Sequence, residues 1–370
     1  MSAAPADPPF LDAHVVVELG TFRTDVHLAC GRGVTAVLGP NGSGKTTVLK
    51  ALAGLHTLAS GHVRAGGRVW SGDGVHLPPE ERGVGMVLAD PLLFPHLSLL
   101  DNVAFGPRSR GMPRAAARAR AAEELGRVGL TDLEGRRPAQ VSQGQAQRAA
   151  LARALATDPE ILLLDEPLSA LDPQTRSATR ADLVHRLREF AGATVLVTHD
   201  PLDALTLGDQ LLFVDDGRVV QSGAPAEVVA RPRSPYVAGV VGLNLLRGTL
   251  TQAGQDAALA RSLDLGRGEH LVVAEVPGGA GPGEELLATI NPAAITLYTE
   301  HPAASARNLW QLEVVAVTVT GQRARVRLDG PGANQLSAEV TLGAVAELGV
   351  VRGARLWASV KATEVSVYPA

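Results

Sequence analysis

The chain has 370 residues, of which 45% are hydrophobic and 19% charged, a composition typical of globular domains and not of disordered chains. Its net charge of −4 gives no basic field that would favour nucleic acid, so no nucleic-acid partner is expected. The single cysteine, Cys30, excludes an internal disulfide and suits a reducing compartment. We expect no secretion signal and no membrane span, because no apolar run approaches about 18 residues. Any work at a membrane must therefore go through a partner.

Roughly the first 235 residues alternate short apolar runs with helical stretches. This pattern is typical of an α/β domain with a parallel sheet. The predicted strands are Val34–Leu38, Gly83–Leu88, Ile161–Leu164, Ala193–Thr198 and Gln210–Val214. The predicted helices are Lys45–Ala53, Arg114–Val128, Gln143–Ala156 and Thr175–Phe190.

The character of the sequence changes after the proline-rich stretch Arg231–Pro235, which predicts a domain boundary. We assign 1–235 to the α/β domain and 236–370 to an all-β region of two OB-like barrel modules, 244–300 and 304–370. The strands predicted in the second module are Leu312–Val319, Arg323–Leu328, Leu336–Leu342, Leu356–Val360 and Val365–Tyr368.

The two modules are predicted from an internal repeat. Ile290–Tyr298 (INPAAITLY) and Val360–Tyr368 (VKATEVSVY) share their apolar positions and both end in tyrosine. Asn244 and Asn308, each followed by leucine, open the two candidate copies. The alternative is a chance match between two ordinary strands, since short alternating runs are common.

A glycine-rich motif, GPNGSGKTT, follows a predicted strand and opens a helix, which is the context that a phosphate-binding P-loop requires. Its glycines let the backbone turn tightly and direct N–H groups at phosphate oxygens, and the helix N-terminus adds partial positive charge. We expect Lys45 to reach the β- and γ-phosphates of ATP, Thr46 to bind Mg²⁺, and Thr47 to contact the α-phosphate. The predicted nucleotide-binding residues are Gly39, Pro40, Asn41, Gly42, Ser43, Gly44, Lys45, Thr46 and Thr47.

A second motif, LLLLDE, is a buried strand that ends in the carboxylates Asp165 and Glu166. Asp165 is expected to hold Mg²⁺, which prefers oxygen ligands and keeps part of its hydration. Glu166 is expected to polarise the attacking water as general base. Many strands end in acidic residues, but this one follows a P-loop in an α/β chain, which makes the prediction specific.

Residues 15–235 resemble the nucleotide-binding subunits of ABC transporters. Ser142, Gly144 and Gln145 in VSQGQAQR look like the signature motif of that family, SALD ending at Asp172 looks like its D-loop, and His199 in VTHD looks like its switch histidine. The resemblance implies a head-to-tail homodimer in which the signature of one subunit completes the ATP site of the other. Ser142 also precedes a helical stretch and is a plausible N-cap, suited to an anion.

The chain departs from the family at three positions. Ala89 stands where the family usually has a glutamine that contacts Mg²⁺ or the lytic water, which leaves the rate or the coupling in doubt; the neighbouring Asp90 is a possible substitute. Gln143 replaces a glycine of the signature. Phe22 is an aromatic candidate for stacking on adenine, although a core role is favoured for it.

The cargo is predicted from two segments. Pro91–Gly106 resembles the region of molybdate importers that meets the permease. Ser305, Arg307 and Asn308 (SARN), with Lys361 and Thr363 (KATEV), resemble elements of the small molybdate-binding barrel domain. That resemblance implies an oxyanion site of hydroxyl, amide and cationic donors, which suits a tetrahedral dianion. The alternative is that Arg307 and Lys361 are ordinary surface charges.

We therefore expect the ATPase subunit of a molybdate importer, held at the cytoplasmic face of the membrane by permease subunits and served indirectly by an extracytoplasmic binding protein. Importers of sulfate, tungstate or ferric iron are the alternatives of the same kind. A non-transport ABC ATPase is disfavoured, because zinc or coiled-coil insertions and a basic surface are absent from the sequence. A stand-alone molybdate store is disfavoured by the intact ATPase motifs.

Overall fold

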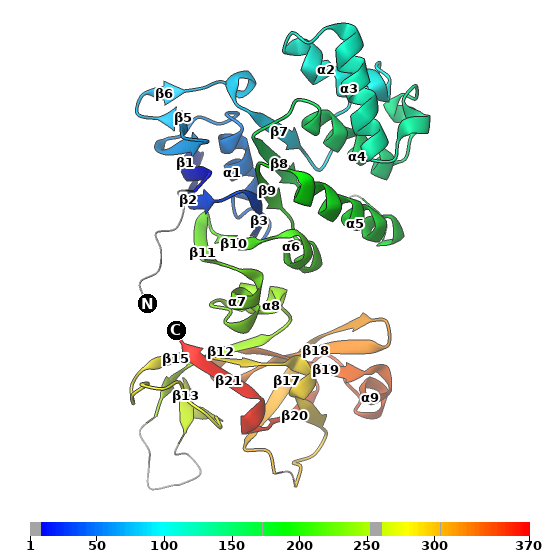
Figure 1. The fold of residues 1–370 in the computed structure, drawn as a ribbon. Coiled ribbons are helices and arrows are strands. Elements are labelled where there is room, and N and C mark those ends of the chain that lie inside the picture. The colour runs from blue at the N-terminus through cyan, green and yellow to red at the C-terminus, as the bar shows by residue number, and fades with distance from the viewer. Residues whose placement is uncertain (1–8, 170, 172, 252–260, 304) are drawn as a thin grey trace. The chain divides into compact units, whose positions relative to one another are not determined.

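The computed structural model describes residues 9–169, 171, 173–251, 261–303 and 305–370. It divides into two compact units, Met1–Val228 and Val229–Ala370, which are described separately (Figure 1). The division falls within helix α7 (Pro225–Ala230), a few residues before the predicted boundary. In the described part of the chain, no helix is long and apolar enough to cross a membrane.

The first unit is built on an 11-stranded sheet with the order β6-β5-β4-β1-β2-β11-β10-β3-β9-β8-β7. Its strands are β1 (Leu11–Leu19), β2 (Phe22–Cys30), β3 (Gly33–Leu38), β4 (Ser60–Ala65), β5 (Arg68–Gly72), β6 (Val75–His76), β7 (Val84–Val87), β8 (Ile161–Asp165), β9 (Ala193–Val197), β10 (Gln210–Asp215) and β11 (Arg218–Gly223).

Only part of this sheet is parallel. Strands β10, β3, β9, β8 and β7 are parallel neighbours, whereas β1, β2, β4, β5 and β6 pair antiparallel with one another. Between the two sets, β11 pairs antiparallel with β10 and parallel with β2. The prediction of a parallel sheet is therefore right for the central strands and wrong for the N-terminal ones. Strands β8 and β9 are buried at every residue, while β2 alternates buried with more exposed positions, as expected where helices cover only part of a mixed sheet.

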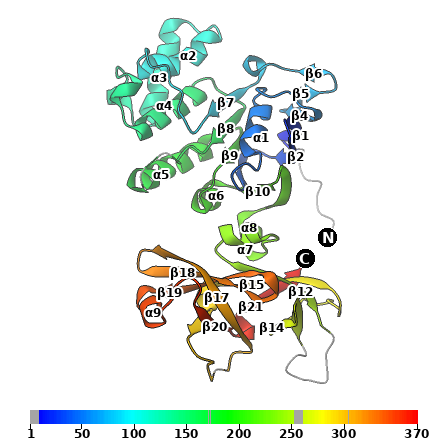
Figure 2. The same cartoon turned by 180° about the vertical axis from the view of Figure 1, so that it is seen from behind.

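Helices cover both faces of the parallel strands. Helix α1 packs on the face that carries Leu163 and Val195, and helices α5 and α6 pack on the face that carries Leu162 and Leu196. Helices α2, α3 and α4 lie together beyond β7 in both views (Figures 1 and 2), and their apolar side chains form a separate cluster. The helices are α1 (Lys45–Leu52), α2 (Leu99–Ser109), α3 (Arg114–Arg127), α4 (Gln143–Leu155), α5 (Pro173–Glu189) and α6 (Pro201–Leu207).

The second unit contains two five-stranded sheets, with the orders β14-β13-β12-β15-β21 and β16-β20-β17-β18-β19. The elements of the first copy are β12 (Asn244–Leu250), β13 (Ser262–Gly266), β14 (Glu269–Val272), β15 (Glu285–Ile290) and β16 (Thr296–Tyr298). Those of the second are β17 (Asn308–Thr320), β18 (Arg323–Asp329), β19 (Gln335–Thr341), α9 (Leu342–Glu347), β20 (Arg355–Val360) and β21 (Val365–Pro369), and α8 (Pro235–Val240) precedes both.

The two copies exchange their last strands. When β12 is matched with β17, β13 with β18, and so on to β16 with β21, the two sheets have the same strand order. Each sheet takes four strands from one copy and its fifth from the other: β21 pairs with β15, and β16 pairs with β20. The copies therefore share one apolar core and are not two independent barrels.

A reciprocal pair of asparagine contacts joins the copies. The Asn244 side chain donates to the Ser337 carbonyl at 2.9 Å and accepts from the Ser337 N–H at 2.7 Å. Asn308 makes the same two contacts with Val272, at 2.9 and 2.7 Å. Both asparagines are buried. Each is the first residue of its own copy, and its side chain satisfies backbone groups of the other copy.

Candidate functional site

The P-loop needs glycine at positions where other side chains would collide. Gly44 lies just before α1 with a φ of 99°, and a Cβ there would lie 2.9 Å from the Thr24 hydroxyl oxygen. A Cβ at Gly39 would lie 2.0 Å from the Val214 carbonyl oxygen. Close packing therefore fixes the loop in a tight turn, closed by a 3.2 Å hydrogen bond from the Ser43 N–H to the Pro40 carbonyl, the kind of backbone conformation that suits an anion.

Lys45, the first residue of α1, is buried at the centre of the loop. Its Nζ donates to the carbonyl oxygens of Gly39 and Pro40, at 2.8 and 2.7 Å. Burial lowers the pKa of Lys45, and the nearby carboxylates of Glu166 and Asp165 oppose that shift. The ammonium group is thus held inside the phosphate-binding loop.

Thr46 and Asp165 meet at the end of β8. The Thr46 hydroxyl donates to Asp165 Oδ2 at 3.0 Å. Burial raises the pKa of Asp165, while the Thr46 hydrogen bond lowers it. A carboxylate beside a hydroxyl is an oxygen donor set of the kind that Mg²⁺ prefers. The buried Thr24 and Ser43 hydroxyls of the same region have no partner among the described residues, as expected of a site that accommodates a polar ligand.

Glu166 follows directly and has a φ of 49°, in the left-handed region that is uncommon for residues other than glycine. Its N–H donates to the Val197 carbonyl at 2.9 Å, which ties it to the end of β9. His199 Nδ1 lies 3.2 Å from Glu166 Oε2. The predicted base and the predicted switch histidine are therefore in contact, and strain of about 1–3 kcal/mol is held at the base.

An open cleft of about 250 Å³ lies over the P-loop. It is lined by Phe22, Asn41, Gly42, Gly44, Lys45, Thr46, Thr47 and Glu166. Phe22 is half-buried at the start of β2 and belongs to this cleft, so the expectation that it is a core residue is corrected. In the sequence, the sign of this contact was that Phe22 is an aromatic residue shortly before the P-loop. Hydrophobic periodicity alone does not show which side chains meet in the fold.

The signature residues lie elsewhere in the chain. Ser142 caps α4: its hydroxyl accepts from the Gln145 N–H at 3.3 Å, and its own N–H donates to Gln145 Oε1 at 2.8 Å. Neither these residues nor Gly144 is among the described residues that line the P-loop cleft. Asp172 lies outside the described residues, while Ser169 of the same motif donates to the Glu166 carbonyl at 2.9 Å.

Ala89 lies in the loop after β7 and is exposed, as is Asp90. The Asp90 carboxylate accepts from the Leu92 N–H at 3.3 Å. Gln147 of α4 donates to the Leu88 carbonyl at 3.1 Å, next to this position. The side-chain amide that the family usually has at position 89 is therefore absent here, while the preceding residue, Leu88, is hydrogen-bonded to α4.

In the second unit, a cavity of about 690 Å³ brings together Ser305 and Lys361. Arg307 and Thr363, both exposed, do not line it. Asn308 is buried and committed to Val272, so we leave it out of the oxyanion site proposed below. The remaining polar lining, which the sequence analysis did not assign, consists of Asn291, Thr296, Tyr298, Ser359 and Glu364.

These features define a P-loop nucleotide-binding protein with a second, all-β unit. Residues 24–169 match the ABC transporter family, and residues 304–367 match the TOBE domain. The chain is 42% identical over 360 residues, 94% of its length and 95% of the relative's, to the molybdenum import ATP-binding protein ModC of Mycobacterium tuberculosis. It belongs to the family of ABC-transporter ATP-binding proteins and is an ATPase.

Other relatives match a shorter part of the chain. The sulfate/thiosulfate import ATP-binding protein CysA of Mycobacterium bovis is 40% identical over 70% of this chain and 71% of its own. Among solved structures, a dimeric ATP-binding cassette in a post-hydrolysis state with ADP and Pi matches with a TM-score of 0.51 and 28% identity, over 58% of this chain and 98% of that one.

Proposed function

We propose that this chain is the ATP-hydrolysing subunit of an importer for molybdate. The observation that carries the proposal is the extent of the similarity: the molybdenum relative matches 94% of the chain, including the second unit, whereas the sulfate relative matches 70%. Cargo-dependent differences among these importers are expected outside the shared ATPase fold. Tungstate and sulfate, with the same charge and shape, are the competing oxyanions.

In this proposal Glu166 accepts the proton of the attacking water. His199 orients the Glu166 carboxylate, because His199 Nδ1 lies 3.2 Å from Glu166 Oε2. Thr46 and Asp165 would hold Mg²⁺, which neutralises charge that develops on the phosphates. Lys45 keeps its positive charge beside the β- and γ-phosphates. Phe22 offers an aromatic ring at the cleft wall, suited to the adenine base.

The active form is a head-to-tail homodimer. Ser142, Gly144 and Gln145 form a capped helix start that is apart from the cleft of their own chain. A capped helix N-terminus binds anions, so these residues and Asp172 complete the site of the partner subunit. Closure and opening of the dimer then drive the permease.

The segment Pro91–Gly106 is the proposed permease contact, which holds the chain at the cytoplasmic face of the membrane. Leu92 and Phe105 are 57% and 47% exposed, and the rings of Phe94 and Phe105 lie 4.7 Å apart. Arg153 of α4 fixes the loop by donating to the carbonyls of Pro91 and Leu92. An apolar surface of this kind suits a helix of a partner.

The cavity around Lys361 is the proposed oxyanion site of the second unit. Ser305, Thr296 and Tyr298 supply hydroxyl donors and Lys361 supplies the cation, which are the groups that a tetrahedral dianion needs. Glu364 also lines the cavity and opposes a dianion. Arg307 and Thr363 stay part of the proposal only as the sequence neighbours of the lining residues Ala306 and Glu364.

Titration calorimetry of the full chain with molybdate, tungstate and sulfate tests the cargo. We expect saturable molybdate binding that Lys361→Gln weakens by about tenfold, since one charge-assisted contact is removed. Arg325→Gln, on the exposed side of β18, is the matched control and should leave binding unchanged. Equal binding of all three anions, or none, would contradict a molybdate-specific site and reopen the choice of cargo.

A further inference from the structure

The segment that follows Glu166 folds back onto it. The Ser169 N–H and hydroxyl both donate to the Glu166 carbonyl, at 3.2 and 2.9 Å. The Leu171 N–H donates to the Leu168 carbonyl at 3.3 Å. The backbone between the end of β8 and the start of α5 is therefore tightly turned, and the carbonyls of Ser169 and Leu171 are available to a donor from elsewhere.

Arg176, in the first turn of α5, joins this loop to a segment that is distant in the sequence. Its Nη2 donates to the carbonyls of Ser169 and Leu171, at 3.0 and 3.4 Å. Its Nη1 lies 3.5 Å from Asp200 Oδ2, and Asp200 directly follows His199. The side chains of this ion pair are only 27% and 23% exposed, so solvent ions screen it less than a pair on the open surface.

Asp200 is held from other sides as well. Its Oδ1 accepts from the Leu202 N–H at 2.8 Å and so caps α6. Its own N–H donates to the Thr198 hydroxyl at 3.0 Å. Arg180 of α5 donates to Asp200 Oδ2 at 3.2 Å and also binds the buried Asp203 of α6. The residue next to the switch histidine therefore has a fixed position, to which Arg176 is attached.

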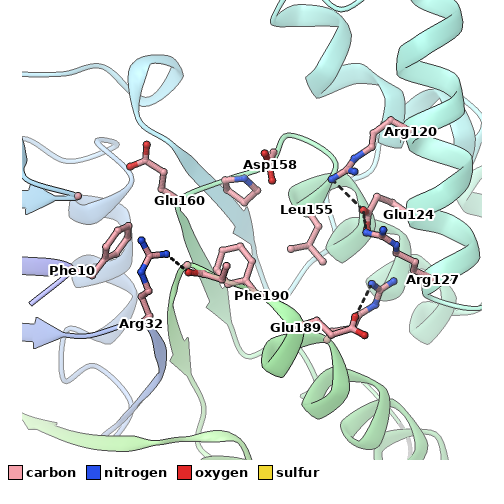
Figure 3. A pocket seen from close by; sticks show the side chains of 15 residues that line it. Phe10, Arg32, Arg120, Glu124, Arg127, Leu155, Asp158, Glu160, Glu189 and Phe190 are labelled. Atoms are coloured by element: carbon pink, nitrogen blue, oxygen red, sulfur yellow. Dashed lines mark hydrogen bonds and ion pairs between the residues drawn. The ribbon is translucent and has the colours of Figure 1, made fainter.

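The charged contacts at the other end of α5 are of a different kind. Glu189 forms an ion pair there with Arg186 of the same helix (Figure 3). Arg120 and Arg127 of α3 pair with Glu124 across the same cleft. None of the described residues that line this cleft contacts Glu166. Those ion pairs hold the C-terminal end of α5, whereas Arg176 acts beside the nucleotide site.

Taken together, these contacts form a closed circuit around the nucleotide site. Ser169 connects Glu166 to Arg176. Asp200 connects Arg176 to the segment of His199. The His199 ring then returns to the Glu166 carboxylate at 3.2 Å. Both partners of that last contact are thus attached, through their own segments, to one guanidinium group.

We propose that Arg176 is a positioning residue for ATP hydrolysis, which keeps the His199 ring against the Glu166 carboxylate by holding both of their segments. A planar guanidinium suits this role, because its N–H groups can donate to carbonyls and to a carboxylate at the same time. The left-handed backbone of Glu166 also requires surroundings that hold it. The inference rests on the roles proposed above for Glu166 and His199.

Steady-state hydrolysis and equilibrium ATP binding by the full chain test the proposal. Arg176→Gln should lower kcat about tenfold and leave ATP affinity unchanged, because the P-loop contacts remain. Retained ATP binding also shows that the variant is folded. Arg176→Lys keeps the charge but should restore little activity, since one ammonium cannot serve the carbonyls and the carboxylate together. Arg188→Gln, exposed on the same helix, is the matched control and should equal the parent. Full activity in Arg176→Gln, or full rescue by lysine, would overturn the proposal.

A double-mutant cycle with Asp200→Asn tests whether Arg176 acts through the segment of His199. Asparagine can still cap α6 through its side-chain oxygen but carries no charge for the arginine. Each single substitution should lower kcat about tenfold, and the double substitution should lower it no further, since both remove the same link. Independent losses that multiply to about 100-fold would refute the link.

Glu166→Gln distinguishes this inference from the function on which it rests. If Glu166→Gln still hydrolyses ATP, the assigned base is wrong and the positioning role falls with it. If Glu166→Gln is inactive while Arg176→Gln is fully active, only the positioning role is wrong. Sedimentation with ATP on the Glu166→Gln background should show the same dimer with and without Arg176→Gln. Loss of that dimer would assign Arg176 to assembly and overturn the proposal.

Discussion

At the scale of single residues, the most informative feature is the conformation of Glu166. A left-handed backbone at a glutamate persists only where surrounding structure holds it, and here its N–H is bound to Val197 while its carboxylate contacts His199. The same residue lines the cleft that contains Lys45. Position and strain together indicate a side chain held in place for a reaction.

Replacement of this carboxylate separates binding from turnover. Glu166→Gln keeps the size of the side chain but removes the proposed base, so ATP should still bind while the hydrolysis rate falls about 100-fold or more. Phosphate release and equilibrium nucleotide binding measure the two quantities. Glu81→Gln, exposed at a distant turn, is the control. Hydrolysis near the parent rate in Glu166→Gln would mean that another group is the base.

Cys30 gives a pH-dependent contribution to stability. Burial raises the pKa of its thiol from the ordinary value of 9.0 to about 11. The unfolded chain therefore loses this proton first, and the contribution is complete below pH 9 and lost as the pH rises to 11. The loss between pH 9 and 11 amounts to about 2 kcal/mol, of about 3 kcal/mol in total at still higher pH. Urea unfolding at several alkaline pH values tests this. The free energy of unfolding should fall less steeply with pH in Cys30→Ala than in the parent protein; identical slopes would contradict the burial argument.

At the scale of elements, the strand exchange makes the second unit depend on both copies at once. Its two asparagines act at the first residue of β12 and of β17 and each binds a strand of the opposite copy. Removal of either side chain leaves a backbone N–H and a carbonyl without their partners. The copies are therefore expected to unfold together.

Asn308→Ala should lower the free energy of unfolding of the second unit by about 1–3 kcal/mol, because both Val272 contacts are lost. Gln311→Ala, at an exposed position of the same strand, should change it by no more than about 0.5 kcal/mol. Urea unfolding followed by the fluorescence of Trp310 and Trp357 measures this. The idea fails if both variants have the same effect.

At the scale of the whole molecule, the signature residues of a chain do not line the P-loop cleft of the same chain. Hydrolysis is therefore expected to depend on a dimer. If Ser142 completes the site of a partner subunit, Ser142→Arg should leave ATP binding to the single chain unchanged and reduce hydrolysis about 100-fold, since the closed dimer cannot form. Sedimentation with ATP on the Glu166→Gln background shows whether the dimer is lost. Full hydrolysis by Ser142→Arg would refute a composite site.

The sequence by itself determined the ATPase fold and predicted the chemistry of its P-loop. The P-loop and the carboxylates that end β8 were predicted by local rules, since glycine conformation and strand burial act over a few residues. The assignment of His199 as a switch histidine came from the resemblance to ABC transporter subunits. The central strands and the helices α1, α3, α4 and α5 were predicted within a few residues of their observed bounds.

The tertiary structure alone decided what depends on contacts between distant segments. The antiparallel half of the sheet results from the pairing of β1 with β2 and β4. The same pairing positions the start of β2, so that Phe22 lies at the cleft. The strand exchange turned a visible repeat into one shared core. Asn308 looked like a ligand in the sequence but its partner is a backbone 36 residues away, because the burial of a side chain is set by the packing around it and not by its own segment.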